Sequence, residues 1–333
     1  MIFDKIRNSV IYSSLVLACL PFSGVVAGTN HTDLCMRYAP ATVTMKARQV
    51  SPHVWYVQGE AGVATDNQGF ISNAGFVTTG AGVVVFDALG SPSLACQLLD
   101  RIREVTGEPV VRVVVSHYHA DHIYGLQVFA DLGAEIVAPA GASEYLESEA
   151  AVERLDERRF SLDPWVNEHT RLVFPDQYLE EGMRFRLGDV DFLVTVVGTA
   201  HSNGDLSLLI EPDQVLFTGD IIFEGRIPFV GDANTGHWLD VLERMDLETI
   251  TALIPGHGEA ADNPNQVIRA TRDYLGFLHR VMGEAVEEFV PFDEAYEAAD
   301  WSAFEKLPAF DLANRRNAYQ VYLYLEAESL DGE

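Results

Sequence analysis

The stretch Ser116-His117-Tyr118-His119-Ala120-Asp121-His122 follows directly on the apolar run 110–115 (VVRVVV) and decides the fold. A run this apolar predicts a strand that is covered on both faces of its sheet. Four ligand-type side chains within six residues can converge if the chain turns out of the sheet at this strand end. Histidine and carboxylate together suit zinc, and also iron or manganese. The stretch therefore predicts a metal site at the end of a buried strand.

Three further residues repeat this topology later in the chain. His201 follows the predicted strand 190–197, Asp220 follows 214–218, and His257 follows 250–254. Alone, each would more often be structural, but together they bring five of the ten histidines to strand ends, which core packing does not explain. Binding sites in open α/β sheets lie beyond the carboxyl ends of strands. The expected metal ligands are His117, His119, His201, Asp121, His122, Asp220 and His257.

Strands and helices alternate in two successive blocks, which predicts two sheets packed together with helices outside them. A helix over 92–105 is expected to begin with Ser91 as its cap and Pro92 at its first position. Beyond Pro264 the pattern is helical only. The other expected elements are strands at 53–58, 70–78, 83–87, 135–138, 183–187 and 206–211, and helices at 122–132, 142–158, 237–246, 264–288 and 311–328.

The motif His117-x-His119-x-Asp121-His122, followed in order by His201, Asp220 and His257, resembles the metallo-β-lactamase superfamily over about residues 50–260. The resemblance implies an αββα sandwich with the metals at one edge. The helical pattern beyond Pro264 predicts that residues 28–262 form the sandwich domain and that 263–333 form a helical extension packed over one face of it, near the active-site edge. The apolar positions of the extension recur at helical spacing and have to be covered.

The same resemblance assigns roles to the candidate ligands. It implies that His117, His119 and His201 hold one metal ion, and that Asp121, His122 and His257 hold a second. It further implies that Asp220 bridges both, that Asp87 steadies the histidine loop from outside the metal ligands, and that Asp121 could relay a proton. Aspartate at position 220 resembles the glyoxalase II, lactonase and general hydrolase branches, because many true β-lactamases have another residue there, such as cysteine.

A narrower resemblance extends beyond the metal motif. The segments 66–73 (DNQGFISN), 226–232 (RIPFVGD), 307–310 (LPAF) and 314–319 (NRRNAY) resemble the SoxH-like, or quinoprotein relay system, zinc metallohydrolases. This group is mostly defined by gene context, so the resemblance implies export and a metal site and leaves the substrate open.

The implied function is hydrolysis of an ester, thioester, lactone or β-lactam carbonyl by a hydroxide that bridges two zinc ions. Two such ions lower the pKa of a shared water to about 7. Three alternatives remain: a β-lactamase proper, an iron-dependent redox enzyme of the same superfamily, and a non-catalytic carrier of a quinone cofactor. The segment 59–72 is placed to form a flap, and Tyr118, Tyr124, Asn203, Phe223 and Arg226 could line the pocket or pack in the core.

The N-terminus has the pattern of an export signal. Lys5 and Arg7 precede an apolar run from Val10 to Val26, and small residues at 25–27 predict cleavage before Gly28. An uncleaved anchor and lipidation at Cys19 are the alternatives. Cleavage predicts a periplasmic or secreted bacterial protein without stable membrane insertion, in which Cys35 and Cys96 either pair or remain separate thiols.

The net charge of the chain limits the classes of molecule that it can bind. There are 50 acidic residues against 22 Lys and Arg, giving a formal net charge of −28. Such a surface repels phosphate backbones, which makes nucleic acid a poor partner and phosphodiester hydrolysis a poor reaction. We therefore expect a small-molecule substrate. Apart from this, the high content of acidic residues indicates a solvated surface.

Overall fold

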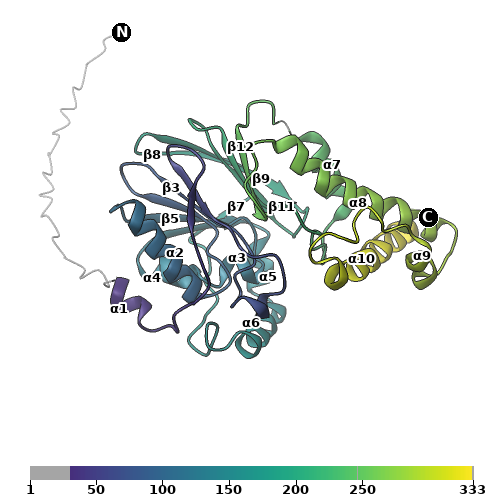
Figure 1. Cartoon of the computed structure of the whole chain (residues 1–333), viewed down its shortest axis with the longest axis horizontal. Helices are drawn as coiled ribbons and strands as arrows, with labels where there is room; N and C mark the ends of the chain where they lie inside the picture. Colours follow the sequence, from purple (N-terminus) through teal and green to yellow (C-terminus); the bar gives the residue numbers. More distant parts are fainter. Residues whose placement is uncertain (1–30, 246, 332–333) are drawn as a thin grey trace, which may run out of the picture.

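Two β-sheets face each other, with helices on both outer sides (Figure 1). The computed structural model describes residues 31–245 and 247–331, so the predicted signal segment 1–27 and Cys19 lie outside the described residues. The first sheet has the order β1 (Ala47–Gln49), β2 (Val54–Val57), β3 (Ala74–Thr78), β4 (Val83–Phe86), β5 (Val110–Val114), β6 (Glu135–Pro139) and β7 (Gln177–Leu179). The second has the order β12 (Ala252–His257), β11 (Val215–Phe223), β10 (Asp205–Ile210), β9 (Val190–Gly198) and β8 (Met183–Leu187).

The apolar core has three parts that follow this layering. Between the sheets, Phe86 of β4 stacks on Phe217 of β11 with ring centroids 5.1 Å apart. Outside the first sheet lie α2 (Pro92–Val105) and α4 (Leu126–Asp131), and outside the second lie α7 (Thr235–Arg244) and α8 (Pro264–Glu287). The predicted αββα sandwich with a C-terminal helical region is confirmed.

Several predicted elements differ in extent from the observed ones. The helix at 92–105 is observed as expected, and Ser91 Oγ accepts a hydrogen bond from the amide of Leu94. The helix expected at 122–132 is divided at Gly125 into α3 (Ala120–Ile123) and α4, because the Gly125 amide bonds to the Leu89 carbonyl instead of within the helix. The backbone of Ala88 passes so close that a Cβ at Gly125 would lie 1.9 Å from its carbonyl oxygen. The helix expected at 142–158 is α5 (Ala142–Leu146) and α6 (Glu149–Ser161), the latter capped by Ser148.

Two strand boundaries also differ, and both differences affect the site. The expected strand 70–78 begins only at Ala74, because the Asn73 amide bonds to Gly256 of β12 and the Phe70 carbonyl to the amide of Glu60, outside the ladder of the first sheet. The expected strand 214–218 continues to Phe223, which puts Asp220 inside β11. Gly219 has φ +53°, and a Cβ there would lie 2.4 Å from Cβ of Ser116, so glycine lets β11 pass close to the histidine loop.

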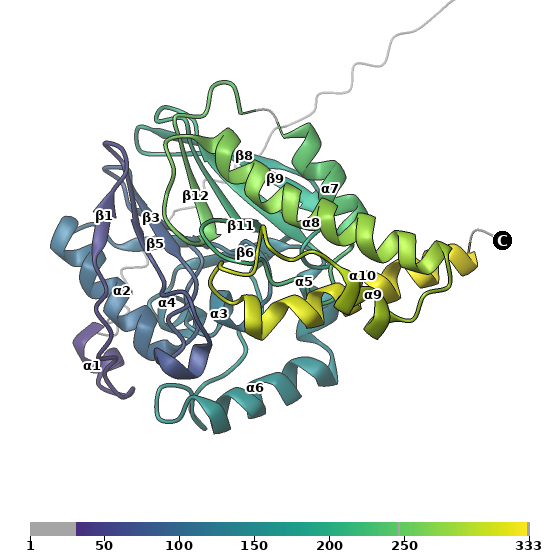
Figure 2. The ribbon, with the colours of Figure 1, turned by 45° about the vertical axis from the view of Figure 1, so that its right-hand side comes forward.

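The C-terminal helices begin on the second sheet and extend beyond it. Thr271 of α8 accepts a hydrogen bond from the Phe223 amide and donates one to the Phe223 carbonyl, which ties α8 to β11. The helix α10 (Phe310–Asp331) lies along α8, with α9 (Phe292–Ala298) beside both, as Figures 1 and 2 show. The domain boundaries after residues 27 and 262 stay predictions.

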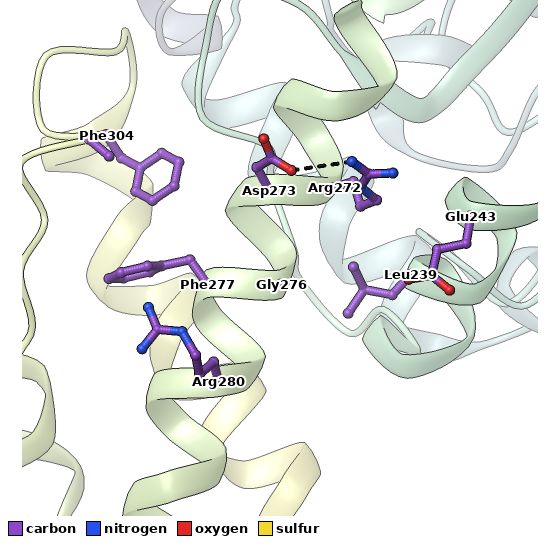
Figure 3. A pocket seen from close by; sticks show the side chains of 9 residues that line it. Leu239, Glu243, Arg272, Asp273, Gly276, Phe277, Arg280 and Phe304 are labelled. Carbon is purple, nitrogen blue, oxygen red and sulfur yellow. Dashed lines mark ion pairs between the residues drawn. The ribbon is translucent and has the colours of Figure 1, made fainter. Parts of the chain in front are cut away.

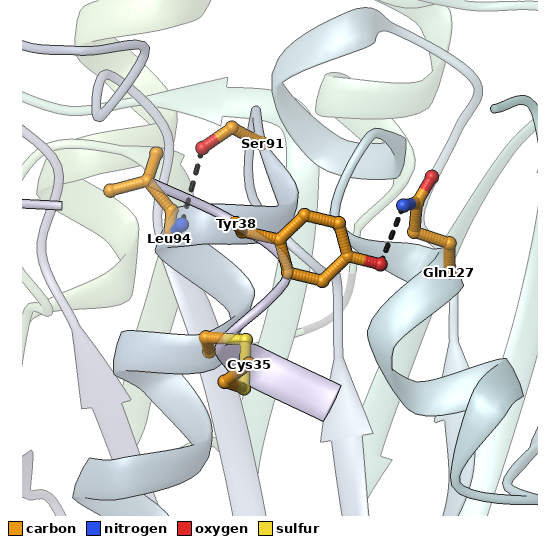
Figure 4. Close-up of a disulfide and its surroundings, with 6 residues drawn as sticks. Cys35, Tyr38, Ser91, Leu94 and Gln127 are labelled. Carbon is orange, nitrogen blue, oxygen red and sulfur yellow. Dashed lines mark hydrogen bonds between the residues drawn. A yellow bond between two sulfur atoms is a disulfide. The ribbon is translucent and has the colours of Figure 1, made fainter. Parts of the chain in front are cut away.

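A disulfide joins the two cysteines among the described residues, which confirms the first of the two alternatives. Cys35, at the end of α1 (His31–Cys35), is bonded to Cys96 of α2, with Cα atoms 5.8 Å apart (Figure 4). Beside it, Gln127 of α4 donates a hydrogen bond to the Tyr38 hydroxyl. Over the described residues, no helix combines the length and the apolar character that crossing a membrane requires.

Candidate metal centre

The first group of ligand-type side chains surrounds the ring of His119. Its Nδ1 lies 3.0 Å from Nε2 of His117 and 2.9 Å from Nε2 of His201. Oδ2 of Asp220 lies 3.4 Å from the same nitrogen of His201. The stretch after β5, the loop after β9 and strand β11 therefore bring His117, His119, His201 and Asp220 to one point, where they could hold a metal ion.

The second group lies on the other side of Asp220. Nε2 of His257 is 3.4 Å from Oδ2 of Asp121 and 3.2 Å from Oδ2 of Asp220. Nε2 of His122 is 3.5 Å from Asp121 and 3.2 Å from Oδ1 of Asp220. Asp121, His122 and His257 could hold a second ion. All seven residues predicted from the sequence thus lie together, and Asp220 contacts both groups.

Hydrogen bonds on the opposite side of the rings fix their orientation. Asp87 accepts hydrogen bonds from the amide and hydroxyl of Ser116, and its Oδ2 lies 2.8 Å from Nδ1 of His122. Asp87 has φ +62°, an unfavourable conformation that these three bonds hold in place. Ser116 Oγ lies 2.8 Å from Nδ1 of His117, and the carbonyl oxygen of Ile71 lies 2.7 Å from Nδ1 of His257.

Burial and neighbouring charges set the protonation of two rings and the shared carboxylate. Burial, reinforced by His122, lowers the pKa of His117 well below its usual value, and burial lowers the pKa of His201 to about 3. Burial would raise the pKa of Asp220, but His257 and His122 hold it well below its usual range. Neutral imidazole and ionised carboxylate are the forms that bind metal ions.

The pKa values of two other rings, His122 and His257, are raised instead. Burial would lower the pKa of His122, but Asp220 and Asp121 raise it well above its usual value. For His257 burial again acts to lower the pKa, and Asp220 is the largest influence that raises it. Asp220, which is buried, and Asp121, which is partly exposed, create a negative field that raises these pKa values and also favours a metal cation at the same place.

Residues that the sequence did not single out hold the loops of the site. Asp205, at the start of β10, accepts hydrogen bonds from the amides of Ala200 and Ser202 and fixes the loop that carries His201. Asn73 donates to the carbonyls of Pro255 and Gly258 on either side of His257. Asn73 ends the segment 66–73 of the narrower resemblance but acts on a distant loop, and only its position near a strand end could have suggested Asp205.

The predicted flap is tied to the site at its base. Ser72 donates a hydrogen bond to the carbonyl oxygen of Asp121, while Asn73 accepts one from the amide of Gly59. Residues 71–73 thus bond to both loops of the second metal group. How far the rest of 59–72 covers the metals stays a prediction.

The expected pocket-lining residues divide into two sets. Tyr118, Tyr124 and Phe223 are buried, and the Phe223 ring stacks on His257 at 5.1 Å, so these side chains support the ligands by packing. Asn203 is exposed, at the loop after His201. Burial lowers the pKa of Arg226, while the charges of Asp220 and Asp121 act to raise it. Its Nη1 is buried without a hydrogen-bond partner among the described residues.

A separate open groove lies away from this cluster. It has a volume of about 500 Å³ and runs between α7, α8 and the turn at Phe304 (Figure 3). The guanidinium of Arg280 lies over the ring of Phe277, and Arg272 pairs with Asp273 at 3.6 Å. None of the seven ligand-type residues lines the groove, so it is not part of the metal centre.

Comparison with known proteins agrees with this geometry. A family model described as the metallo-beta-lactamase superfamily matches residues 67–257. The metallo-beta-lactamase IND-1 of Chryseobacterium indologenes is 22% identical over 195 residues, which cover 57% of this chain and 73% of that protein. The acyl-coenzyme A thioesterase MBLAC2 of Gallus gallus is 29% identical over 181 residues, or 50% of this chain and 64% of that one.

Solved structures share the fold. The metallo-beta-lactamase from Pontibacter korlensis matches with a TM-score of 0.57 at 18% identity, over 70% of this chain and 99% of that one. The sec-alkylsulfatase Pisa1 from Pseudomonas sp. matches with a TM-score of 0.63 at 19% identity, over 84% of this chain and 50% of that one. The narrower SoxH-like resemblance stays a prediction. By its family model and its relatives, the chain belongs to the metallo-beta-lactamase superfamily and is a metal-dependent hydrolase.

Proposed function

We propose that the protein is an exported dinuclear zinc hydrolase that cleaves a small ester, thioester or lactone. The observation that carries the proposal is the position of Asp220 between two groups of ligand-type side chains, with oxygen atoms 3.4 Å from His201 and 3.2 Å from His122. A carboxylate with two oxygens can serve two ions at once. A mononuclear iron site would need only one of the groups.

The residues present fit a pair of zinc ions. His122 Nε2 and Asp220 Oδ1 are buried and have no hydrogen-bond partner among the described residues, although such atoms are costly to leave unsatisfied. His119 Nδ1 faces Nε2 of His117 and Nε2 of His201. A hydrogen bond between two neutral imidazole rings needs one shared proton, and Nδ1 can share a proton with only one of these two neighbours. Imidazole and carboxylate ligands suit zinc, with iron or manganese as the alternatives.

In this proposal His117, His119 and His201 hold one ion, Asp121, His122 and His257 hold the other, and Asp220 contacts both. When bound, the ions would supply a hydroxide at neutral pH and polarise the substrate carbonyl. Asp121 is the more accessible carboxylate, with a side chain 20% exposed against 5% for Asp220. Asp121 can therefore accept a proton from solvent or substrate and pass it to the leaving group, while Asp87 keeps the His122 ring in place.

The charge of the chain favours neutral substrates over anionic ones. An acidic surface, with net charge −28, repels carboxylates before they reach the site. The thioesterase named among the relatives supports a thioester or ester as the substrate class. One observation favours a β-lactamase proper as the second candidate: the unpartnered Nη1 of Arg226, near Asp220 and Asp121, could receive the carboxylate of a β-lactam.

One experiment separates these functions. Metal content of the purified protein is measured together with turnover of chromogenic esters, thioesters, lactones and cephalosporins. We expect two zinc ions per chain and a higher kcat/KM for neutral carbonyl substrates than for cephalosporins. Efficient cephalosporin turnover without esterase or lactonase activity would make the β-lactamase the better description. One iron per chain would favour the redox alternative, and full metal loading without any turnover would favour a carrier.

Zinc binding to the metal-free protein is expected to release more than about one proton per chain at pH 6.5. The sign follows from His122 and His257, whose pKa values are both raised above the usual 6.5 by the carboxylates beside them. Both rings are therefore mainly protonated before loading and neutral as ligands afterwards. Calorimetry in buffers of different ionisation enthalpy measures the number, and a slope of zero would contradict this protonation scheme.

Export is part of the proposal and has its own test. The disulfide between Cys35 and Cys96 supports it, because disulfides persist in oxidising compartments and are rare in the cytosol. We expect protein purified from the periplasm of a bacterial host to have the intact mass of a chain that begins at Gly28. A mass that includes residues 1–27, or a diacylglycerol on Cys19, would contradict cleavage at this position.

A further inference from the structure

The helix α10 has apolar side chains on two opposite faces. The first is buried, whereas the second is largely exposed among the described residues, with Tyr319 alone packing edge-on against Phe292 of α9 at 4.9 Å. Ala318 and Val321 are fully buried against α8. On the opposite face Leu312, Tyr319, Leu323 and Leu330 are exposed by 64%, 44%, 37% and 70%. A surface helix normally carries charged residues on the side away from its core. The second apolar face is therefore suited to contact with another protein surface.

The exposed face follows the repeat of a coiled coil. Its members are separated alternately by four and three residues, which keeps them on one stripe of the helix, about 27 Å long. We call this stripe the α10 seam. It consists of Leu312, Arg316, Tyr319, Leu323, Glu326 and Leu330.

The residues of the α10 seam are arranged symmetrically about Val321, so that the seam can pair with a second copy running in the opposite direction. Leu312 and Leu330 lie nine positions on either side of Val321, and Tyr319 and Leu323 lie two positions on either side. Arg316 and Glu326 lie five positions on either side. When two copies are placed antiparallel about this centre, leucine meets leucine, tyrosine meets leucine, and arginine meets glutamate. Each contact occurs twice, as a two-fold symmetric interface requires.

We propose that two copies of this chain associate through their α10 seams as an antiparallel coiled coil. Within one copy, neither Arg316 nor Glu326 forms an ion pair with another described residue, and Arg316 lies over the Phe229 ring, so neither charge is neutralised before the second copy binds. A parallel arrangement would place arginine against arginine and glutamate against glutamate. The charges thus select the antiparallel arrangement and this register.

The position of the helix in the fold allows this arrangement. The N-terminal end of α10 lies at the sandwich, and its C-terminal end projects beyond it with the distal part of α8 (Figures 1 and 2). In an antiparallel pair the two sandwiches lie at opposite ends of the coiled coil. Arg316 also lies over the ring of Phe229, which is 6.4 Å from His119, so the seam begins beside the metal centre.

Sedimentation velocity on the purified protein from 1 to 100 µM tests the proposal. We expect twice the mass of one chain, and at least about a 100-fold weaker dimer for Leu323→Glu, because the substitution places two charges in the seam. Leu323 is partly exposed, so this variant still folds, as circular dichroism would check. Phe160→Glu, which removes a 91% exposed phenylalanine from α6, is the matched control and should not change the mass.

A charge exchange tests the register. Arg316→Glu and Glu326→Arg should each weaken the dimer, because each places like charges opposite one another. The double variant should restore it, since the same pairs form with their signs exchanged. Glu328→Arg, on the same helix but off the seam, should leave the dimer intact. A single-chain mass at 100 µM, a Leu323→Glu dimer as tight as the wild type, or a double variant no better than the single ones would overturn the proposal.

Discussion

Asp220→Asn is expected to lower kcat/KM on the order of 10⁴-fold, the scale of losing a residue on which a whole catalytic assembly depends. The carboxylate lies 3.4 Å from His201 in one group and 3.2 Å from His122 and from His257 in the other. An amide removes the negative charge and presents an NH₂ group to one side. The variant should therefore lose both metal ions, and elemental analysis should find less than one per chain.

The matched comparison is Asp121→Asn, which removes the same charge from one group only. It should retain one metal ion per chain and lose less activity than Asp220→Asn. Asp189→Asn, in the exposed turn between β8 and β9, controls for the loss of one surface charge and should leave metal content and kcat/KM unchanged. Two tightly held ions in Asp220→Asn would show that this residue does not link the groups.

The metal cluster could be predicted because its members share a topological property that local sequence reveals. Each of the seven side chains lies at or near the end of a strand, and glycines flank His201, Asp220 and His257. Strand ends of one sheet meet at one edge, which explains the proximity of the ligands from β9, β11 and β12. The ligands after β5 belong to the first sheet, and their approach to the others follows from the sandwich that the family resemblance implied. Even the misplaced boundary of β11 did little harm, because Asp220 points toward the same edge from inside the strand.

The residues that hold the loops could not be predicted in the same way. Asn73 reaches the carbonyls of Pro255 and Gly258, more than 180 positions away, and no local pattern encodes such a contact. The division of the expected helix 122–132 has the same origin, since the backbone of Ala88 approaches Gly125 from another strand end. Helical periodicity reports on the helix alone, whereas its interruption depends on a neighbour that the sequence does not identify.

The C-terminal helices show how tertiary contacts extend a predicted packing role toward the site. The side-chain amide of Asn317 on α10 donates to the carbonyl of Pro228, and its oxygen accepts from the amide of Val230. The same loop carries Arg226 and Phe229, and the Phe229 ring lies 6.4 Å from His119. The extension therefore holds a loop beside the metal centre as well as covering the second sheet.

Cys35→Ser and Cys96→Ser are each expected to lower the free energy of unfolding by about 4 kcal/mol, the loop-entropy estimate for a bridge across 61 positions. In a chain of this size the loss corresponds to a fall in Tm of about 6 °C. Thermal unfolding followed by circular dichroism measures both. Because either substitution opens the same loop, the double variant should be no less stable than each single one, and reduction of the wild type should reproduce the effect.

The full loss requires that the N-terminal arm unfolds together with the sandwich. Leu34 is fully buried and Met45 is 3% exposed, and both belong to the same apolar cluster as α2, which argues for one cooperative unit. No candidate metal ligand comes from α1 or α2, so kcat at 25 °C should stay unchanged while Tm falls. If the single variants unfolded at the wild-type temperature, the arm would have to detach before the rest of the chain, and the bridge would stabilise the arm alone.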